Sequence, residues 1–395
     1  MQSDDVDDQL GSTILANLCA RGINKRKLKE IEEQTSIQAT VITETRKYKL
    51  WLPPFQLAVF DPNSSPIIWC PNIKPVHVEA QVEMQQDEHM VLRPVENPVF
   101  GVFLYQVGGE TPSRFAPILT EVTDVAVDDK HMYVVDSLLH RVCVFDKESL
   151  AKLYEWGSHG AAAGQFNFSE NQKHFVGEGH KYVGGCITVD DENVYVSDKN
   201  NGRIQVFNKV GKFDCTWGAC GNEDGRFCGP AGIAVSDDVI FVSDSGNHRV
   251  QFFCKKTKEF LGSWGTRGSA NGQFNYPAGL AVDSGHVYVC DSENNRVQIF
   301  DLKGVYVQQI DLKQRHPTSL PSGISVTSTS IFVSLSSKID VFCKADLSLL
   351  RSFGGRSWGD RHWDKGQFHF PRGITVQSGL LYVADSGNHR VQVFR

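Results

Sequence analysis

The stretch DSGNHRVQ occupies residues 244–251, and the same eight residues return at 385–392. An Asp, a His and an Arg so close together suit either a catalytic or metal-binding cluster or a tight turn between strands. Three further stretches match when aligned on their Asp: DSLLHRVCVF from Asp136, DKNNGRIQVF from Asp198 and DSENNRVQIF from Asp291. A catalytic group of residues occurs once in a protein, whereas this pattern recurs, so we interpret it as part of the scaffold.

The spacing of the copies predicts the fold. Asp198, Asp244 and Asp291 follow one another at intervals of 46 and 47 residues, a period typical of propeller blades. A degenerate copy, IFVSLSSKIDVF at 331–342, brings the number of copies to six. Each copy lies among four strand-like apolar runs that are separated by turn residues, such as PAGIAV at 230–235. We therefore predict an all-β fold, a six-bladed β-propeller over residues 99–395.

The two ends of the propeller are expected to share one blade. The last copy ends with its third strand, so the outer strand of that blade must come from elsewhere in the chain. The run VFGVFLYQVGG at 99–109 resembles a fourth strand and precedes the first inner strand. We predict that 102–107 closes the last blade, which removes the open edges of the ring.

In the signature turn, Gly and Asn are the residues that tolerate the positive φ of a tight hairpin. The Asp carboxylate is expected to accept amide hydrogens of the turn, and the Arg lies opposite it across the hairpin. We assign this structural role to Asp136, Arg141, Asp198, Arg203, Asp244, Asn247, His248, Arg249, Asp291, Asn294, Arg296, Asp385, Asn388, His389 and Arg390.

Residues 1–98 are predicted to form an N-terminal accessory segment. An acidic start is followed by a short charged helix at 21–34, and from about residue 40 the sequence becomes strand-like. Cys19 and Cys70 stand alone and no C-x-x-C pair occurs in the chain, so neither a RING nor a B-box site is expected.

The repeated pattern resembles the NHL repeat over roughly residues 99–395. The resemblance implies a six-bladed propeller whose signature residues maintain the blades. Many animal relatives carry RING, B-box and coiled-coil modules before the propeller, so a role in ubiquitin transfer would be substrate recognition without a RING. Relatives that repress translation imply binding of single-stranded RNA as an alternative. Related peptidyl-hydroxyglycine lyases, which place metal ligands in the central channel, imply a metal-dependent lyase or hydrolase as a second alternative.

Two segments break the symmetry of the repeats and are the predicted partner-binding site. Because both are expected on the face that carries the signature turns, they should border one sector of it. Exposed Trp and Arg are typical anchors of protein interfaces, and they also stack on and neutralise single-stranded RNA. Phe368, like Phe227 and Phe274, is instead expected to cap a blade core. The predicted binding residues are Arg356, Trp358, Arg361, His362, Trp363, Lys365 and Arg372 of the link 354–372, and Lys173, His174, Phe175, Lys181 and Tyr182 of the insert 167–182.

Composition favours a protein-binding scaffold among these alternatives. The net charge of −6 gives no bulk attraction to nucleic acid or to an anionic membrane, although a local basic patch would suffice for RNA. The predicted inner strands contain no His, and no hydrolase, zinc-protease or nucleotide-binding motif occurs, so no enzyme activity, cofactor or metal is expected. No secretory signal is recognisable, and five of the ten cysteines lie in apolar runs: Cys143, Cys186, Cys254, Cys290 and Cys343. Buried free thiols and a cytoplasmic location are therefore expected.

Overall fold

The computed structural model describes residues 101–108, 118–168, 184–355 and 365–395, together with the backbone of five strands between residues 38 and 77. The chain divides into two compact units, Met1–Glu96 and Asn97–Arg395. Among the described residues, no helix is long and apolar enough to cross a bilayer.

The N-terminal unit contains a five-stranded antiparallel sheet whose strands follow chain order. The strand-like part predicted from about residue 40 corresponds to this sheet, whereas the predicted helix at 21–34 lies outside the described residues. Its strands are β1 (Gln38–Ile42), β2 (Lys47–Leu52), β3 (Phe55–Val59), β4 (Ile67–Cys70) and β5 (Ile73–His77).

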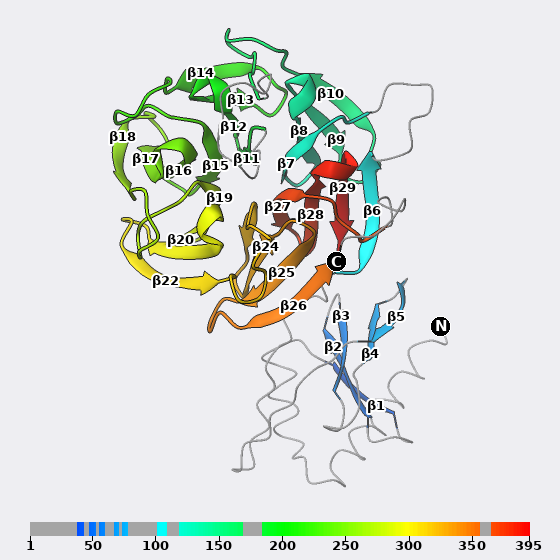
Figure 1. Ribbon diagram of the computed structural model, residues 1–395. Helices are drawn as coiled ribbons and strands as arrows, with labels where there is room; N and C mark the ends of the chain where they lie inside the picture. Colours follow the sequence, from blue (N-terminus) through cyan, green and yellow to red (C-terminus); the bar gives the residue numbers. More distant parts are fainter. Residues whose placement is uncertain are drawn as a thin grey trace. The chain divides into compact units, whose positions relative to one another are not determined.

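The second unit is a six-bladed β-propeller, as predicted. In its described residues, six four-stranded antiparallel sheets are arranged around a central axis (Figure 1). From the innermost strand outwards, the first blade consists of β7 (Val122–Val127), β8 (His131–Asp136), β9 (Arg141–Asp146) and β10 (Lys152–Trp156). The second blade consists of β11 (Ile187–Val189), β12 (Asn193–Asp198), β13 (Arg203–Asn208) and β14 (Phe213–Trp217). The third blade consists of β15 (Pro230–Val235), β16 (Val239–Asp244), β17 (Arg249–Cys254) and β18 (Phe260–Trp264).

The other three blades complete the ring. The fourth blade consists of β19 (Pro277–Val282), β20 (His286–Asp291), β21 (Arg296–Asp301) and β22 (Tyr306–Asp311). The fifth consists of β23 (Ile324–Val326), β24 (Ser330–Ser334), β25 (Lys338–Cys343) and β26 (Leu349–Gly354). The sixth consists of β27 (Pro371–Gln377), β28 (Leu380–Asp385), β29 (Arg390–Phe394) and β6 (Phe103–Gly108).

The predicted closure is confirmed. Strand β6 pairs with β29 as the outer strand of the sixth blade, with Val107 opposite Val391. Backbone hydrogen bonds of 3.0 and 2.9 Å join Val102 and Arg395 beside it. The ring of Phe103 meets that of Phe394 edge-on, with 5.9 Å between their centroids. Segments almost 300 residues apart in the sequence therefore form one sheet, as Figure 1 shows for β6 and β29.

In four blades the core is capped by a phenylalanine from the link that enters the blade: Phe166, Phe227, Phe274 and Phe368. Phe368, Phe227 and Phe274 are at most 2% exposed, as expected for this role. Each packs on a phenylalanine of the third strand of the blade, with ring centroids 5.4–5.6 Å apart. The close approach requires glycine beneath the ring: a Cβ on Gly265, whose φ is +102°, would lie 2.5 Å from the ring of Phe274. This packing explains why a phenylalanine recurs in the links and why a glycine recurs at the end of the outer strand, as at Gly218, Gly265 and Gly354.

The opposite face carries a second inter-blade contact that the sequence did not reveal. Asp128 accepts the hydroxyl of Tyr133 from its own blade and pairs with Lys209 of the next blade at 3.2 Å. Asp190 and Asp283 make the same contacts with Lys255 and Lys344. Burial alone would raise the pKa of Asp128, but backbone N–H groups and the Lys209 ammonium lower it to about 2.

The cysteines agree only in part with the prediction. All eight described cysteines are free, but of those in apolar runs only Cys143 and Cys290 are buried. Cys254 and Cys343 are the last residues of β17 and β25, where the strand leaves the sheet and the side chain reaches solvent. Cys186 is partly exposed because it precedes β11 and lines the central channel.

Candidate binding surfaces of the propeller

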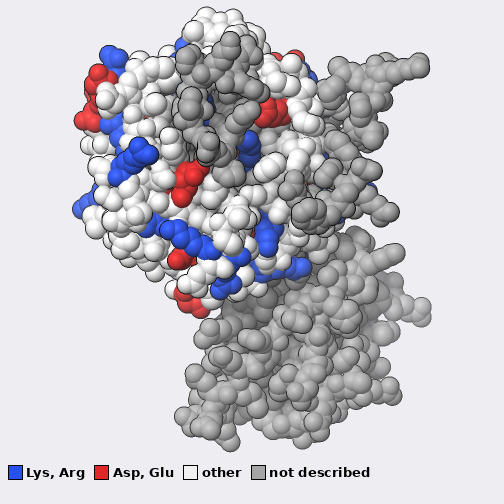
Figure 2. Space-filling model, in the orientation of Figure 1, with Lys and Arg blue, Asp and Glu red and all other residues white. Residues whose placement is uncertain are grey.

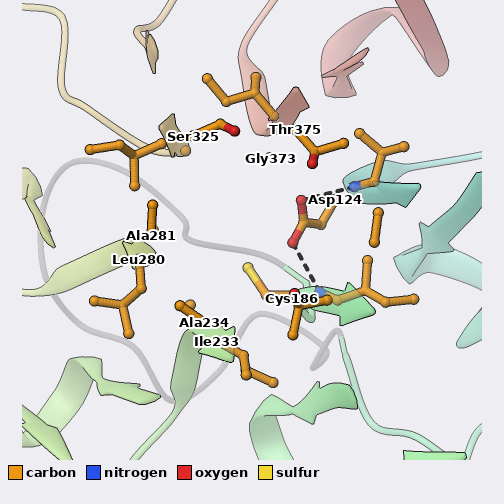
Figure 3. Close-up of a pocket in the computed structure, with 18 of the residues that line it drawn as sticks. Asp124, Cys186, Ile233, Ala234, Leu280, Ala281, Ser325, Gly373 and Thr375 are labelled. Carbon is orange, nitrogen blue, oxygen red and sulfur yellow. Dashed lines mark hydrogen bonds between the residues drawn. The ribbon is translucent and has the colours of Figure 1, made fainter. Parts of the chain in front are cut away.

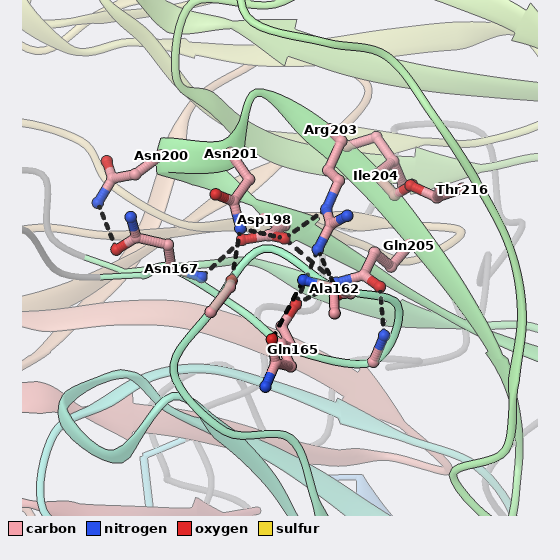
Figure 4. Close-up of polar contacts among 12 residues, drawn as sticks. Ala162, Gln165, Asn167, Asp198, Asn200, Asn201, Arg203, Ile204, Gln205 and Thr216 are labelled. Atoms are coloured by element: carbon pink, nitrogen blue, oxygen red, sulfur yellow. Dashed lines mark hydrogen bonds and ion pairs between the residues drawn. The ribbon is translucent and has the colours of Figure 1, made fainter.

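The signature residues form one buried polar network in each well-preserved blade, shown for the second blade in Figure 4. Asp198 is fully buried, and its Oδ1 accepts the backbone N–H of Asn167 at 2.7 Å. Its Oδ2 accepts hydrogen bonds from Asn201 Nδ2 (2.9 Å), Arg203 Nε (2.7 Å) and Gln205 Nε2 (3.2 Å). An ionised carboxylate has about four acceptor sites, so Asp198 has little capacity left for a ligand.

The signature Arg and Gln extend this network to the link that enters the blade. Arg203 Nη2 donates to the carbonyl oxygens of Ala162 and Gln165, at 2.8 and 3.0 Å. Gln205 donates to Gln165 O and accepts the N–H of Gly164. The turn and the link therefore lie on the same face, which we call the signature face.

Two details of the turn differ from the expectation. The Asp side chains of the five clear copies make no hydrogen bond to the backbone amides of their own turn. The turn is a 3-10 turn that satisfies its own amides, so Asp244 Oδ1 accepts the N–H of Cys228 in the link instead. The positive φ falls on His248 (+54°), rather than on Gly246 or Asn247. His248 Nδ1 then accepts the N–H of Tyr276 in the next link, at 3.2 Å.

In the other four clear copies, the signature Arg also pairs with the signature Asp, at distances of 2.7–2.9 Å. The first copy has Leu139 in place of the Asn, and there Asp136 accepts Thr120 and the N–H of Glu121. The residues so placed, all in or beside the turns η1 (Ser137–Leu139), η3 (Ser245–Asn247), η4 (Ser292–Asn294) and η5 (Ser386–Asn388), are Asp136, Arg141, Asp244, Asn247, Arg249, Asp291, Asn294, Arg296, Asp385, Asn388, His389 and Arg390.

Most of the predicted partner-binding residues lie outside the described residues. This holds for Lys173, His174, Phe175, Lys181 and Tyr182 of the insert, and for Arg356, Trp358, Arg361, His362 and Trp363 of the sixth link. Lys365 is exposed, with its ammonium 5.7 Å from the ring centroid of Phe103. Arg372 does not belong with these loop residues. It is the second residue of β27, because the strand already begins at Pro371, and it lines the central channel.

A basic sector on the signature face was missed from the sequence. Lys313 and Arg315 are exposed in the link 312–323, which contains no acidic residue. Lys338, at the start of β25 in the fifth blade, and Lys365, in the link that enters the sixth blade, also belong to this basic sector. In the view of Figure 2, Lys and Arg side chains gather over β22 to β26. The sequence did contain a signal for this sector, because the link 312–323 enters the fifth blade, whose copy of the repeat is degenerate.

The central channel is a cavity of about 260 Å³ lined by the six inner strands (Figure 3). Its walls are mostly small or aliphatic, but Asp124, Cys186, Lys199 and Arg372 also line it. Asp124 is 8% exposed and reaches from β7 towards β11, accepting the N–H groups of Val125 and Ile187 at 2.8 and 2.9 Å. Burial raises the pKa of Asp124 to about 6, against the effect of these hydrogen bonds. No group of three potential metal ligands occurs among the described residues.

The comparisons with known proteins agree with this geometry. The family model of the NHL repeat matches residues 227–253, 274–300 and 368–394, which span the third, fourth and sixth signature turns. A comparison with curated protein sequences finds no match. Among solved structures, a streptogramin B lyase is similar at 11% identity and a TM-score of 0.49, over 74% of this chain and 97% of that chain. The computationally designed protein Ika8 is similar at 9% identity and a TM-score of 0.41, over 88% and 94%.

Neither of these solved structures is close enough to indicate what this chain binds. The repeat matches and the six blades do identify the family. The chain is an NHL-repeat propeller protein, and such propellers generally act as binding scaffolds.

Proposed function

We propose that the propeller is a non-catalytic scaffold that binds a protein partner on its signature face, in the sector of the fifth and sixth blades. The basic sector carries this proposal: Lys313, Arg315 and Lys365 are exposed there. Little negative charge faces solvent among the described residues of this sector. Asp340 is buried against His316, and Asp311 is its exposed acidic residue. An acidic segment of a partner would be complementary to this surface, and complementary charge gives specificity and speeds association.

The neighbouring signature residues support binding rather than catalysis. Their carboxylates, guanidinium groups and amides are already engaged with the link backbone. The link 354–372 contains Lys365 of the basic sector and also Arg361 and Trp363, and it remains part of the predicted site. If the chain serves ubiquitin transfer, this surface is the one that would select the substrate.

A charge-reversal variant tests the proposal. Lys313→Glu with Arg315→Glu should abolish capture of crosslinked protein partners, because it replaces two cations of the sector with two anions. The matched control is Lys256→Glu with Lys303→Glu, which makes the same charge change in exposed turns of the opposite face. Equal capture by both variants would place the site elsewhere. A third variant, Arg361→Ala with Trp363→Ala, tests the sixth link separately.

The salt dependence distinguishes a protein partner from single-stranded RNA, which the same cations would attract. Binding to RNA releases counterions, so its affinity should fall steeply between low and physiological salt. An interface anchored by aromatic residues should change little over that range. Scoring protein and RNA separately after crosslinking, at two salt concentrations, decides between the two ligands.

A further inference from the structure

The sixth link ends in an aromatic residue whose ring is exposed. Phe370 is the second residue after the cap Phe368, a position that Phe168, Gly229 and Tyr276 occupy in the links to the second, third and fourth blades. Phe370 is 44% exposed, whereas Phe168 is 1% exposed and Tyr276 is partly buried. Among the described residues, Phe370 is the one exposed Phe, Tyr or Trp.

At two other junctions between blades, a histidine of the preceding turn covers the equivalent ring. His140 stacks on Phe168 with 6.2 Å between ring centroids, and His248 lies 4.7 Å from the ring of Tyr276. In both places His Nδ1 also accepts the backbone N–H of the aromatic residue, at 3.1 and 3.2 Å. One imidazole thus makes two contacts, one with the backbone and one with the ring.

The degenerate fifth turn replaces only the backbone contact. It has no His, and the carbonyl oxygen of Ser336 accepts the N–H of Phe370 at 3.0 Å. The ring of Phe370 contacts that of its neighbour His369, at 4.7 Å, but no ring of the fifth turn covers it. Its φ of +51° costs free energy in a residue with a Cβ, and Gly229 fills the same position where the preceding turn has Gly202. Folding of the link therefore does not require an aromatic ring here.

The ring of Phe370 lies within the basic sector. Its hydrogen-bond partner Ser336 is two residues before Lys338, and Lys365 precedes it in the same link. The exposed cations Lys313 and Arg315 belong to the link that enters the adjoining fifth blade. The sector therefore combines one exposed apolar ring with several cations.

We propose that Phe370 is the apolar anchor of the basic sector, and that the partner contributes an acidic segment with an aliphatic or aromatic side chain that packs on this ring. The inference rests on the proposed function and describes its partner more closely. The apolar side chain buries area on Phe370, while neighbouring carboxylates are attracted by Lys338 and Lys365. Single-stranded RNA is bound by stacking successive bases on several aromatic rings, and the described part of the sector exposes one.

Pools of fluorescent nonapeptides test this preference. The central residue of each pool is Leu, Phe or Ser, and the flanking positions are mixtures of Asp, Glu, Gly and Ser. Fluorescence anisotropy measures their binding to the full chain. We expect the Leu pool, the Phe pool or both to bind about tenfold more tightly than the Ser pool, because only an apolar centre can bury area on Phe370.

A glycine variant isolates the ring. Phe370→Gly should fold, because Gly229 holds the same position with a φ of +68°. In this variant the three pools should bind alike, at the strength of the Ser pool with the wild type. The matched control Tyr276→Gly removes the equivalent ring of the fourth link and should keep the preference for an apolar centre. A wild type without this preference, or Phe370→Gly with the full preference, would overturn the proposal.

The charge-reversal variant Lys313→Glu with Arg315→Glu separates this inference from the proposed function. It should lose the binding of all pools together with the capture of crosslinked partners. If it loses capture while Phe370→Gly keeps the preference, the surface binds a protein but Phe370 is not the anchor. If capture is intact, the proposed function itself fails. Tighter binding of an oligouridine of matched length, abolished in Phe370→Gly, would show base stacking and overturn the acidic segment as the ligand.

Discussion

The residue before the signature Arg determines how each turn is built. In the five clear copies this residue is His140, Gly202, His248, Asn295 or His389, and each has a positive φ of 51–61°. Gly adopts this conformation freely and Asn readily, whereas His occupies it at some cost. In the third blade that cost is offset by a contact with the next link, since His248 accepts the N–H of Tyr276 and its ring lies 4.7 Å from the tyrosine ring.

Substitutions of His248 separate backbone strain from this contact. His248→Ala loses the contact and leaves a Cβ residue at positive φ, so the free energy of unfolding should fall by about 1–3 kcal/mol. His248→Gly also loses the contact but suits the backbone, as Gly202 does in the second blade, and should lose less than the Ala variant. Urea denaturation measures both. An Ala variant as stable as the Gly variant would contradict the argument from φ.

The same histidine makes stability depend on pH. Burial lowers the pKa of His248, with the charge of Arg267 as the next cause, so the folded chain favours neutral imidazole. Its contribution to stability is complete above the unfolded pKa of about 6.5 and is lost as the pH falls through the lower folded value. Between pH 7 and 5 the wild type should therefore lose more stability than His248→Gly does.

At the scale of the strand and the blade, the sequence predicted the recurring strands and caps, and it missed contacts between blades and what is particular to one copy. The inner strand Pro230–Val235 and the cap Phe368 were predictable, because period, turn residues and apolar runs all recur. The grouping of Arg372 with the link 354–372 was wrong, because β27 already begins at Pro371 and Arg372 lines the channel. The position of Lys199 in the channel lining depends on how neighbouring blades are arranged, and no spacing in the sequence reports that.

The fifth blade shows how a degenerate copy keeps its form. Its turn has lost the signature Asp and Arg, and Asp340 stands where other copies have Gln205, Gln251, Gln298 and Gln392. Asp340 is fully buried and lies 2.7 Å from His316 Nε2 of the link that enters the blade. The blade and the link that enters it are thus joined by a different pair of residues. The carboxylate now comes from the third strand, whereas in the clear copies it comes from the end of the second strand.

A double-mutant cycle tests this pair. His316→Ala should destabilise the chain by about 3–5 kcal/mol, because it leaves a buried carboxylate without its partner. Asp340→Asn in the His316→Ala background removes that charge and should recover part of the loss. Thermal or urea unfolding of the two single variants and the double variant gives the coupling energy. Strictly additive losses would mean that His316 and Asp340 do not act as a pair.

For the whole molecule, stability depends on closing the ring. In the described residues, each blade packs on its two neighbours, and the contacts on both faces, such as Asp190 with Lys255 and His248 with Tyr276, join one blade to the next. The sixth blade is the one place where the chain's two distant segments must meet in a single sheet. Strand β6 covers the edge of β29 there, and Phe103, Phe353 and Phe368 surround Phe394.

Two deletions that differ by the length of β6 test the closure. Removal of 1–96 takes away only the first compact unit and should leave the cooperative melting of the propeller in place. Removal of 1–108 also takes β6, which exposes the edge of β29 and uncovers Phe394, so the ring loses its continuous packing and its unfolding should become broad or begin at much lower temperature. Calorimetry of both truncated chains makes the comparison. If the shorter chain melts as sharply and at the same temperature as the longer one, the outer strand is dispensable and the propeller holds together as an open ring.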